Sequence, residues 1–366
     1  MCEFKYKQSI FFFTIILCLI TISFSDLLVP KNNDFFVLAQ ASNISNSFLA
    51  TFQDNKSNML LGSWNAGVVK EKIIDFVKNV TDPSSPVYIL PEDRIAVFDN
   101  DGTMWSEKPA PFQAFFILDR IEELARSNPD LRQDKVVSQL LEKNFTNLQL
   151  GEKDVLYLAL ITHSNITQTD FNDMVEQWIN TAKHPQKHVR FVELVYQPMI
   201  ELVNFLQDNQ FKTFIVSGGG VDFMREALSK VYEIPYEQII GSSVKYRYID
   251  NAGSGNSTIF REPELNSFDN NEAKPENIQL HIGKVPVIAV GNSDGDLEML
   301  TYSDDNNEDN KSLEIIVHHD DAIREYAYDS GAEKILKEAE KRGWNVVSME
   351  NDFLNIFPIK NITNIN

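Results

Sequence analysis

The chain has 366 residues, of which 43% are hydrophobic, enough to bury one large core with or without a smaller domain beside it. Acidic residues outnumber basic ones by 53 to 33, and the formal charge of −20 repels polyanions, which argues against nucleic acid as a partner. The only cysteines are Cys2 and Cys18, so the chain that follows them has no disulfide and no cysteine-based metal site.

The N-terminal region carries the pattern of an export leader. Lys5 and Lys7 precede an uncharged apolar stretch over residues 10–24, shorter than the roughly 20 residues that span a bilayer. We therefore expect a signal peptide or N-terminal anchor over residues 1–25, an extracytoplasmic location (secreted, periplasmic or surface-anchored), and membrane contact only if this segment stays uncleaved. The Asn- and Ser-rich residues 26–65 show no periodicity and predict a disordered tether.

The first folded elements are predicted from residue 70 onward. Apolar side chains at helical spacing predict a helix over residues 70–80, which the prolines of TDPSSP end. The apolar run IAVF followed by DNDGT predicts a buried strand that ends at Asp99 and Asp101. Further helices are predicted over residues 112–126, 135–142, 153–162 and 169–182.

The second half of the chain alternates between helices and apolar strands. Helices are predicted over residues 199–206 and 222–231, and strands over residues 213–217, 285–290 and 313–319. Such alternation predicts an α/β fold with a doubly wound parallel sheet, in which ligands bind at the carboxyl ends of the strands. Three predicted strands end in polar, glycine-containing turns: DNDGT, SGGG and GNSDGD.

These three turns together favour a catalytic site. Each turn alone is also typical of a hairpin, of a flexible connection or, for GNSDGD, of a solvated loop or weak calcium site. Asp99 and Asp101, however, suit a nucleophile that accepts a phosphoryl group and a general acid that later acts as a base. Oxygen ligands point to Mg²⁺, and the Ser217 hydroxyl and Gly218 N–H can donate to a phosphate.

The same motifs resemble a known family. The stretches AVFDNDGTMW, HPQKHVRFVELVYQPM, FIVSGGGVDFMR, AVGNSDGDLEML and VHHDDAIREYAYD, within about residues 63–358, resemble haloacid dehalogenase (HAD) superfamily hydrolases of the phosphoserine-phosphatase-like kind, in an exported branch. The resemblance implies a Rossmann-like core over residues 66–108 and 191–358. Residues 109–190 would form an inserted helical cap that closes over the site and selects substrates.

The resemblance also implies roles for individual residues in the first two motifs. Asp99 would be the nucleophile that becomes an aspartyl phosphate and a ligand of Mg²⁺. Asp101 would be the general acid and base, with its backbone carbonyl also on Mg²⁺. Thr103 would support this loop beside the substrate phosphate, which Ser217 and the Gly218 amide would bind.

A lysine and a fourth motif would complete the implied site. Lys274, at a predicted helix start, is favoured as the phosphate-binding lysine over Lys284, which directly precedes a strand. Asn292 stands where the commoner pattern has an aspartate, so its side-chain oxygen would bind Mg²⁺ without a charge. Asp296 matches the final aspartate of the motif and is expected at the metal, and Asp294 is an extra carboxylate in the same turn.

The sequence thus predicts an exported, Mg²⁺-dependent phosphomonoesterase that acts on small organic phosphate esters through an aspartyl phosphate. One alternative is an exported protein that binds a phosphate ligand through a decayed site, which Asn292 favours. The other is a haloacid dehalogenase, although departing halide needs no proton and would leave Asp101 without a use. Glu107 and Lys108, next to the catalytic turn, could face a leaving group or simply be solvated.

The histidines are expected to be structural. His184 and His188 have the spacing of a helical metal-binding pair, but Pro185 favours a loop. His318 and His319 end a predicted strand, and adjacent strand residues point to opposite faces, so they cannot bind one ion together.

Overall fold

A computed structural model of the chain describes residues 60–142, 151–250, 256–308 and 311–358. The predicted leader and most of the predicted tether lie outside these residues. No helix in the described ranges is long and apolar enough to cross a bilayer. The last residues of the predicted tether are packed, because Trp64 is 2% exposed and its ring lies 4.9 Å from that of Phe353. The tether prediction is therefore wrong for this short part.

The described chain is built on an eight-stranded sheet in the order β2-β5-β4-β3-β1-β6-β7-β8. Its strands are β1 (Ile95–Phe98), β2 (Ile166–Thr167), β3 (Lys212–Gly220), β4 (Ile239–Ile249), β5 (Thr258–Ser267), β6 (Ile288–Gly291), β7 (Leu313–His318) and β8 (Asn345–Ser348). Along this order every pair from β4 to β8 is parallel, whereas β5 pairs antiparallel with β4 and β2. The strand that carries the DNDGT turn, β1, lies between β3 and β6.

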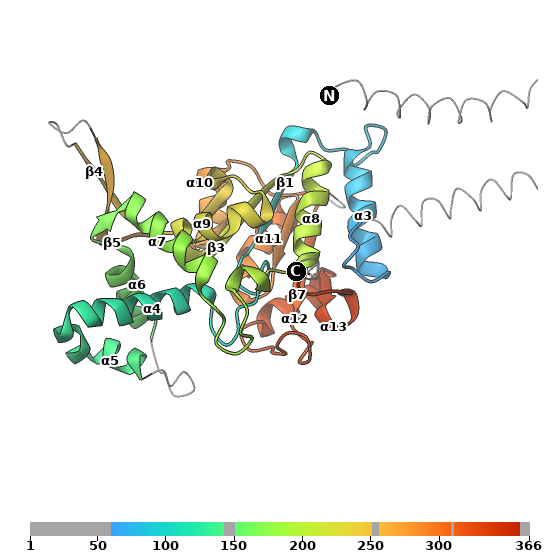
Figure 1. The fold of residues 1–366 in the computed structure, drawn as a ribbon. Coiled ribbons are helices and arrows are strands. Elements are labelled where there is room, and N and C mark those ends of the chain that lie inside the picture. Colours follow the sequence, from blue (N-terminus) through green and yellow to red (C-terminus); the bar gives the residue numbers. More distant parts are fainter. Residues whose placement is uncertain (1–59, 143–150, 251–255, 309–310, 359–366) are drawn as a thin grey trace, which may run out of the picture. The chain divides into compact units, whose positions relative to one another are not determined.

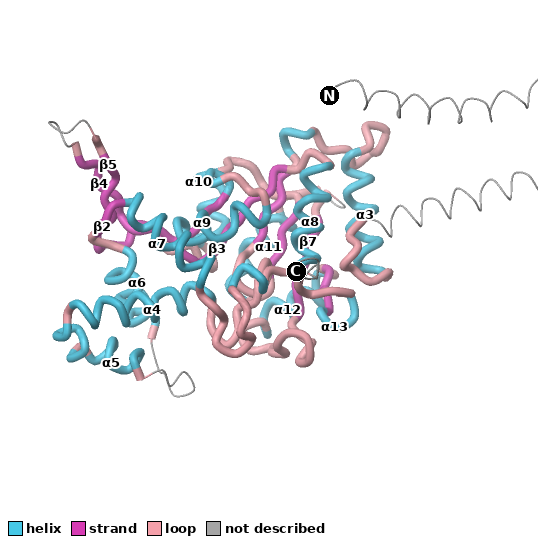
Figure 2. The backbone as a smooth tube through the Cα atoms, in the orientation of Figure 1, coloured by secondary structure: helices cyan, strands magenta, loops and turns pink. Residues whose placement is uncertain are grey.

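Helices surround this sheet, as the ribbon and the tube both show (Figures 1 and 2). They are α3 (Val68–Thr81), α4 (Phe112–Ser127), α5 (Lys135–Leu141), α6 (Glu152–His163), α7 (Gln168–Thr181), α8 (Gln197–Asp208), α9 (Val221–Tyr232), α10 (Ala273–His281), α11 (Leu297–Asp305), α12 (Glu333–Arg342) and α13 (Met349–Asp352). The helices predicted from apolar periodicity match α3 to α9 within two residues at either end. The signal is clear where a helix presents an apolar stripe to the core, as α3, α7 and α9 do.

Alternate side chains of β1 face opposite sides of the sheet. Ala96 and Phe98 belong to an apolar cluster with residues of α3, α8 and α9. Ile95 and Val97 belong to a second cluster with residues of α10, α11 and α12. Parallel strands covered on both faces need apolar residues at every position, which is why IAVF shows no alternation. The two clusters confirm the predicted doubly wound α/β fold.

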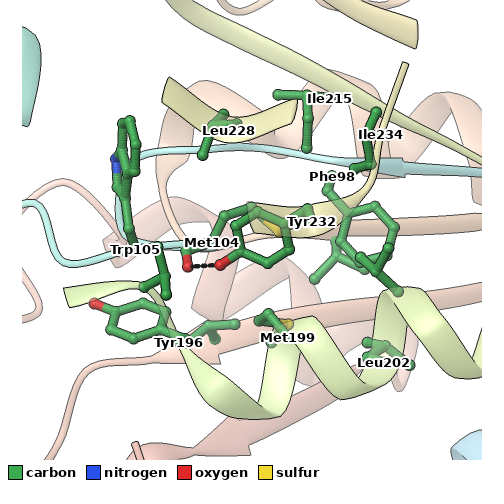
Figure 3. Close-up of a cluster of buried hydrophobic side chains, with 14 of the residues drawn as sticks. Phe98, Met104, Trp105, Tyr196, Met199, Leu202, Ile215, Leu228, Tyr232 and Ile234 are labelled. Atoms are coloured by element: carbon green, nitrogen blue, oxygen red, sulfur yellow. Dashed lines mark hydrogen bonds between the residues drawn. The ribbon is translucent and has the colours of Figure 1, made fainter. Parts of the chain in front are cut away.

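The turn that follows β1 is packed into the first of these clusters. Figure 3 shows Met104 and Trp105 beside Tyr196, Leu228 and Tyr232, and the Tyr232 hydroxyl donates to the backbone oxygen of Met104. Met104 and Trp105 are at most 1% exposed. Residues just beyond the candidate catalytic turn are therefore fixed by the hydrophobic core.

Residues 109–190 lie between β1 and β3 in the chain and hold α4, α5, α6, β2 and α7. The first three of these helices share an apolar cluster of their own. Helix α7 packs on α9 and on the hairpin of β4 and β5, which Figure 1 shows beside α6 and α7. Strand β4 continues the parallel sheet, and β5 adds antiparallel pairs with β4 and β2 at its edge.

Candidate active site

Asp99 lies at the carboxyl end of β1, where its N–H donates to Val290 O of β6 at 2.8 Å. Its side chain meets Lys274, which comes from the first turn of α10. Lys274 Nζ donates to Asp99 Oδ1 at 2.6 Å and to Asp296 Oδ1 at 2.5 Å. All three side chains are buried. Two carboxylates thus share one buried ammonium group, which fixes Asp99 in place.

Asp296 is held by its own turn as well. Its Oδ2 accepts from the N–H groups of Asn292 at 3.0 Å and Ser293 at 2.9 Å. Gly291 permits the tight turn, because a Cβ there would lie 2.6 Å from that of Asp296. Both carboxylate oxygens of Asp296 already have protein donors, so the geometry makes it the partner of Lys274. It favours a place for Asp296 outside the direct ligands of a cation, which the sequence left open.

The side chain of Asn292 faces three oxygens beside Asp99. One atom of its amide end lies 3.0 Å from Asp101 O, 3.0 Å from Thr103 Oγ1 and 3.3 Å from Asp99 Oδ2. If this atom is the amide nitrogen, it donates to all three. If it is the amide oxygen, it accepts from the Thr103 hydroxyl and faces two further oxygens, Asp101 O and Asp99 Oδ2.

The second orientation of this amide fits a magnesium ion. Octahedral Mg²⁺ with bonds of about 2.1 Å sets neighbouring oxygen ligands about 3 Å apart, which matches these separations. The described residues contain no group of three or more His, Cys, Asp and Glu side chains that could hold a metal. A cation here would therefore depend on the Asn292 amide and the Asp101 backbone carbonyl together with Asp99.

The turn that carries Asp101 is closed by short contacts. Gly102 has φ of +81°, and a Cβ there would lie 2.2 Å from Asn292 Nδ2, so only glycine fits. The Gly102 N–H donates to Trp105 O at 2.9 Å. The Trp105 indole N–H donates to Asp101 Oδ1 at 2.7 Å. The carboxylate of Asp101, two residues after Asp99, is thus held in a defined position.

The SGGG segment at the end of β3 runs beside Asp99, because β1 and β3 are parallel neighbours with Phe98 opposite Ile215. Ser217 is 2% exposed. The backbone of the next residue is braced, since Ser242 Oγ donates to Gly218 O at 2.8 Å and accepts from Asp269 N at 3.0 Å. A hydroxyl and rigid backbone groups are therefore available near Asp99 for binding an anion.

Burial and nearby carboxylates raise the pKa values of Asp99 and Asp101. Burial and then Asp296 raise the pKa of Asp99 to about 8, although Lys274 opposes this. Burial raises the pKa of Asp101 to about 6, which the Trp105 hydrogen bond opposes and Glu107 reinforces. Without a further positive charge, Asp99 is therefore mostly protonated near neutral pH, whereas a bound cation would hold it ionised.

A comparison with protein families identifies the part of the chain that carries these residues. The family model described as haloacid dehalogenase-like hydrolase matches residues 96–301, more than half of the chain. The chain belongs to this family. The match confirms the family that the motifs indicate, and it runs from β1 to α11, the elements that carry Asp99, Ser217, Lys274 and Asn292.

Several solved structures resemble this haloacid dehalogenase-like hydrolase at low identity. A protein of unknown function from Anaerococcus prevotii DSM 20548 is 13% identical with a TM-score of 0.47, covering 78% of this chain and 94% of that one. A protein of unknown function from Bordetella pertussis Tohama I is 12% identical with a TM-score of 0.45, covering 69% and 97%. A phosphoserine phosphohydrolase-like protein from Francisella tularensis is 16% identical with a TM-score of 0.37, covering 69% and 94%. No curated protein matches the sequence.

The structure distinguishes between the two candidate lysines and gives the contacts of Asp294, the extra carboxylate of the fourth motif. It places Lys274 on Asp99, whereas Lys284 is exposed and pairs with Asp93 at 2.5 Å. Asp294 Oδ1 accepts from the N–H groups of Lys334 and Ile335 and so caps α12. Asp294 therefore has a structural explanation in this hydrolase.

Glu107 and Lys108 pair with a residue from the far end of the chain. The Tyr328 hydroxyl donates to Glu107 Oε1 at 2.6 Å, and Lys108 Nζ lies 4.0 Å from the centre of the Tyr328 ring. His184 Nε2 donates to Lys108 O at 3.0 Å, and His184 Nδ1 accepts from Lys187 N at 3.1 Å. Both ring nitrogens of His184 are used, which confirms its predicted structural role.

One contact with the candidate catalytic turn that the sequence analysis missed comes from His319. Its Nε2 donates to Gly102 O at 2.8 Å, and Nδ1 lies 3.5 Å from Glu325 Oε2. The carboxylate of Glu325 also accepts from the hydroxyl of Ser106 and from the N–H of Tyr326. His319 therefore supports the turn that carries Asp101, and only its position at the end of a strand next to β6 hinted at this.

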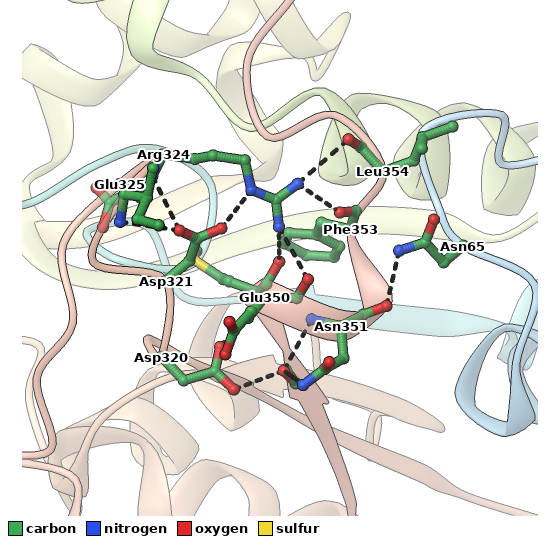
Figure 4. Close-up of polar contacts among 12 residues, drawn as sticks. Asn65, Asp320, Asp321, Arg324, Glu325, Glu350, Asn351, Phe353 and Leu354 are labelled. Atoms are coloured by element: carbon green, nitrogen blue, oxygen red, sulfur yellow. Dashed lines mark hydrogen bonds and ion pairs between the residues drawn. The ribbon is translucent and has the colours of Figure 1, made fainter.

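The loop that carries Glu325 is tied to the last residues of the described chain. Figure 4 shows Arg324 between Asp321 and the backbone oxygens of the C-terminal segment. Its guanidinium donates to Asp321 Oδ2, to Met349 O at 2.7 Å and to Phe353 O at 2.8 Å. The support behind the turn that carries Asp101 thus extends to α13.

Proposed function

We propose that this protein is an extracytoplasmic, Mg²⁺-dependent phosphomonoesterase that acts on small organic phosphate esters through an aspartyl phosphate. The observation that carries the proposal is the buried contact of Asp99 with Lys274, with Asp101 two residues further on and held by its own turn. Nucleophile, cation and acid meet at the carboxyl end of the central strand, where α/β enzymes bind their ligands.

The first half of the reaction transfers the phosphoryl group to the protein. A carboxylate oxygen of Asp99 attacks phosphorus, and the bond between phosphorus and the ester oxygen breaks. Protonated Asp101 gives its proton to that oxygen, and the alcohol leaves. Lys274 and the Ser217 hydroxyl balance the charge on the phosphoryl oxygens during transfer.

The second half releases phosphate. Asp101, now ionised, takes a proton from water as the water oxygen attacks phosphorus, and the bond from phosphorus to Asp99 breaks. Inorganic phosphate leaves, Asp99 is again a carboxylate and Asp101 again carries a proton, so the cycle is balanced. The pKa of Asp101, about 6 because of burial, is suited to a group that must both give and take a proton.

Magnesium would be held by Asp99, the Asp101 backbone carbonyl and the Asn292 side-chain oxygen. Bound there, it would supply positive charge that keeps Asp99 ionised and offsets the charge of the substrate phosphate. The fit rests on the three facing oxygens described above.

Residues 109–190 are proposed as the cap that selects the substrate. One contact links this segment to the phosphate side of the site: the Gly220 N–H donates to Gln113 Oε1 of α4 at 2.8 Å. Gln113 Nε2 also contacts His163 Nε2 of α6 at 2.9 Å, and burial lowers the pKa of His163 to about 3, so this ring is neutral and accepts. A movement of α4 would therefore displace Gln113 and change the hydrogen bond to the SGGG segment.

The test is hydrolysis of p-nitrophenyl phosphate by the full chain with magnesium, with EDTA, and after the substitution Asp99→Asn. We expect turnover that requires magnesium and disappears in the variant. Asp294→Asn is the matched control, because it changes a carboxyl of the same turn that caps α12 and should leave turnover unchanged.

Two outcomes would favour the alternatives. Folded protein that binds inorganic phosphate in a calorimeter but hydrolyses no ester would indicate a binding protein with a decayed site. Release of halide from a 2-haloacid, without phosphatase activity, would indicate a dehalogenase.

A further inference from the structure

We propose that Trp105 is a positioning residue that determines which oxygen of Asp101 carries the catalytic proton. The inference rests on the proposed phosphatase reaction and deepens it. The Trp105 indole N–H donates to Asp101 Oδ1 at 2.7 Å, and no other described tryptophan donates to a residue of the catalytic turn.

An indole can only donate, because its nitrogen has no lone pair to offer. Asp101 Oδ1 must therefore accept this hydrogen bond in both protonation states of the carboxyl. When Asp101 takes up a proton, Oδ2 is the favoured position, because the carbonyl oxygen of a carboxylic acid accepts a hydrogen bond better than its hydroxyl oxygen does. The contact thus orients the carboxyl and leaves the same oxygen as proton donor in every turnover.

The indole ring has little freedom to leave this position. Trp105 is 1% exposed, and its ring centre lies 4.7 Å from that of Phe112 and 6.4 Å from that of Phe223. Its backbone pairs with Val195 on one side and accepts from Gly102 N on the other. Figure 3 shows the ring standing above Tyr196 and beside Leu228. The core, not the solvent, sets the direction of the indole N–H.

This position matters most for substrates that need the proton. An alkoxide is a poor leaving group, so cleavage of an alkyl phosphate depends on proton transfer from Asp101 to the ester oxygen as the bond to phosphorus breaks. A p-nitrophenolate leaves without a proton. Loss of the indole N–H should therefore slow alkyl esters selectively, whereas a general weakening of the fold would slow both classes alike.

The first arm of the test compares Trp105→Phe with the wild type on glycerol 2-phosphate and on p-nitrophenyl phosphate. We expect kcat/KM, which reports the step in which the alcohol leaves, to fall at least about tenfold more on the alkyl ester, as one charge-assisted hydrogen bond of about 1.5 kcal/mol implies. Trp178→Phe is the matched control, because its indole also donates to a carboxylate, Asp119 Oδ2, at 2.7 Å. Trp178→Phe should change the hydrolysis of both substrates equally. Equal losses of activity on both substrates in Trp105→Phe would overturn the proposal.

The second arm reads the contact without turnover. The chain has four tryptophans, so an ¹⁵N-¹H spectrum shows four indole signals, and Trp105→Phe identifies one of them by its loss. If that variant does not fold, Phe variants of Trp64, Trp178 and Trp344 identify the signal by elimination. Asp101→Ala should shift the Trp105 signal upfield and leave the others in place. An unmoved signal would overturn the proposal even if the protein is an active phosphatase, and a moved signal in an inactive protein would place the error in the proposed function.

Discussion

Replacement of Asn292 by aspartate tests the cation site most directly, because it restores the charge that the commoner motif carries. In the absence of metal the new carboxylate cannot donate to its neighbours. It would face Asp101 O at 3.0 Å and Asp99 Oδ2 at 3.3 Å. Two unit charges 3.3 Å apart repel by about 5 kcal/mol at an effective dielectric constant of about 20, and proton uptake makes this an upper limit.

We therefore expect Asn292→Asp to destabilise the metal-free protein and to bind magnesium more tightly. Thermal unfolding in EDTA should show a melting temperature lowered by up to on the order of 10 °C, and magnesium should recover most of this loss. Calorimetric titration should show about 10- to 1,000-fold tighter magnesium binding, since each 1.4 kcal/mol of relieved repulsion gives about tenfold.

The matched control is Asn277→Asp. Asn277 Nδ2 donates to the buried Asp269 Oδ1 at 2.8 Å, so this change also sets two carboxylates against each other, but away from the three oxygens. It should destabilise the protein without recovery by magnesium. If Asn292→Asp binds magnesium no more tightly than the wild type, or recovers no better than Asn277→Asp, the assignment of the three oxygens to a cation is wrong.

Three further predictions concern groups outside the cation site. Burial raises the pKa of Glu314 from 4.5 to about 7. Between these pH values the folded state keeps a proton that the unfolded state has lost, so the free energy of unfolding should fall by about 3 kcal/mol between pH 4.5 and 7. In urea titrations of Glu314→Gln, the free energy of unfolding should no longer fall over this pH range. If it falls as steeply as in the wild type, Glu314 does not cause the pH dependence. Arg261→Met should cost about 1.5–3 kcal/mol in the same assay, because it removes the buried ion partner of Asp222 and leaves that carboxylate only Arg225 at 3.2 Å and the Tyr246 hydroxyl at 2.6 Å; a loss below about 1 kcal/mol would count against the Arg261 pair. His319→Ala should lower kcat about tenfold with an unchanged circular dichroism spectrum, since the donor to Gly102 O is lost; full activity would show that the turn keeps its shape alone.

The central fold could be predicted from the sequence because its elements are buried in simple patterns. IAVF is apolar at all positions and α7 has an apolar stripe, so period and composition both identify them. The hairpin of β4 and β5 was missed, although the alternation over Lys245 to Tyr248 is a strand signal. That signal was weak because much of the hairpin is exposed and no long apolar run marks it.

The site could be predicted only as far as its motifs reach. Asp99 follows from its place at the end of an apolar strand, whereas Lys274 follows from the resemblance to the family, whose third motif it matches better than Lys284 does. Trp105 and His319 could not be assigned, because their roles depend on which atom each side chain meets in the folded chain. The place of Asp296 likewise depends on hydrogen bonds from Asn292 and Ser293 that no spacing reveals.

The Arg324 contacts have a practical consequence for the end of the chain. Because this guanidinium holds the backbone of Met349 and Phe353, the segment after β8 is part of the scaffold that carries Glu325 and, through His319, the catalytic turn. A nonsense mutation or proteolytic cut before α13 would therefore impair the enzyme even though it removes none of the reacting groups. A C-terminal affinity tag should be added after residue 358 and should not replace the segment after β8.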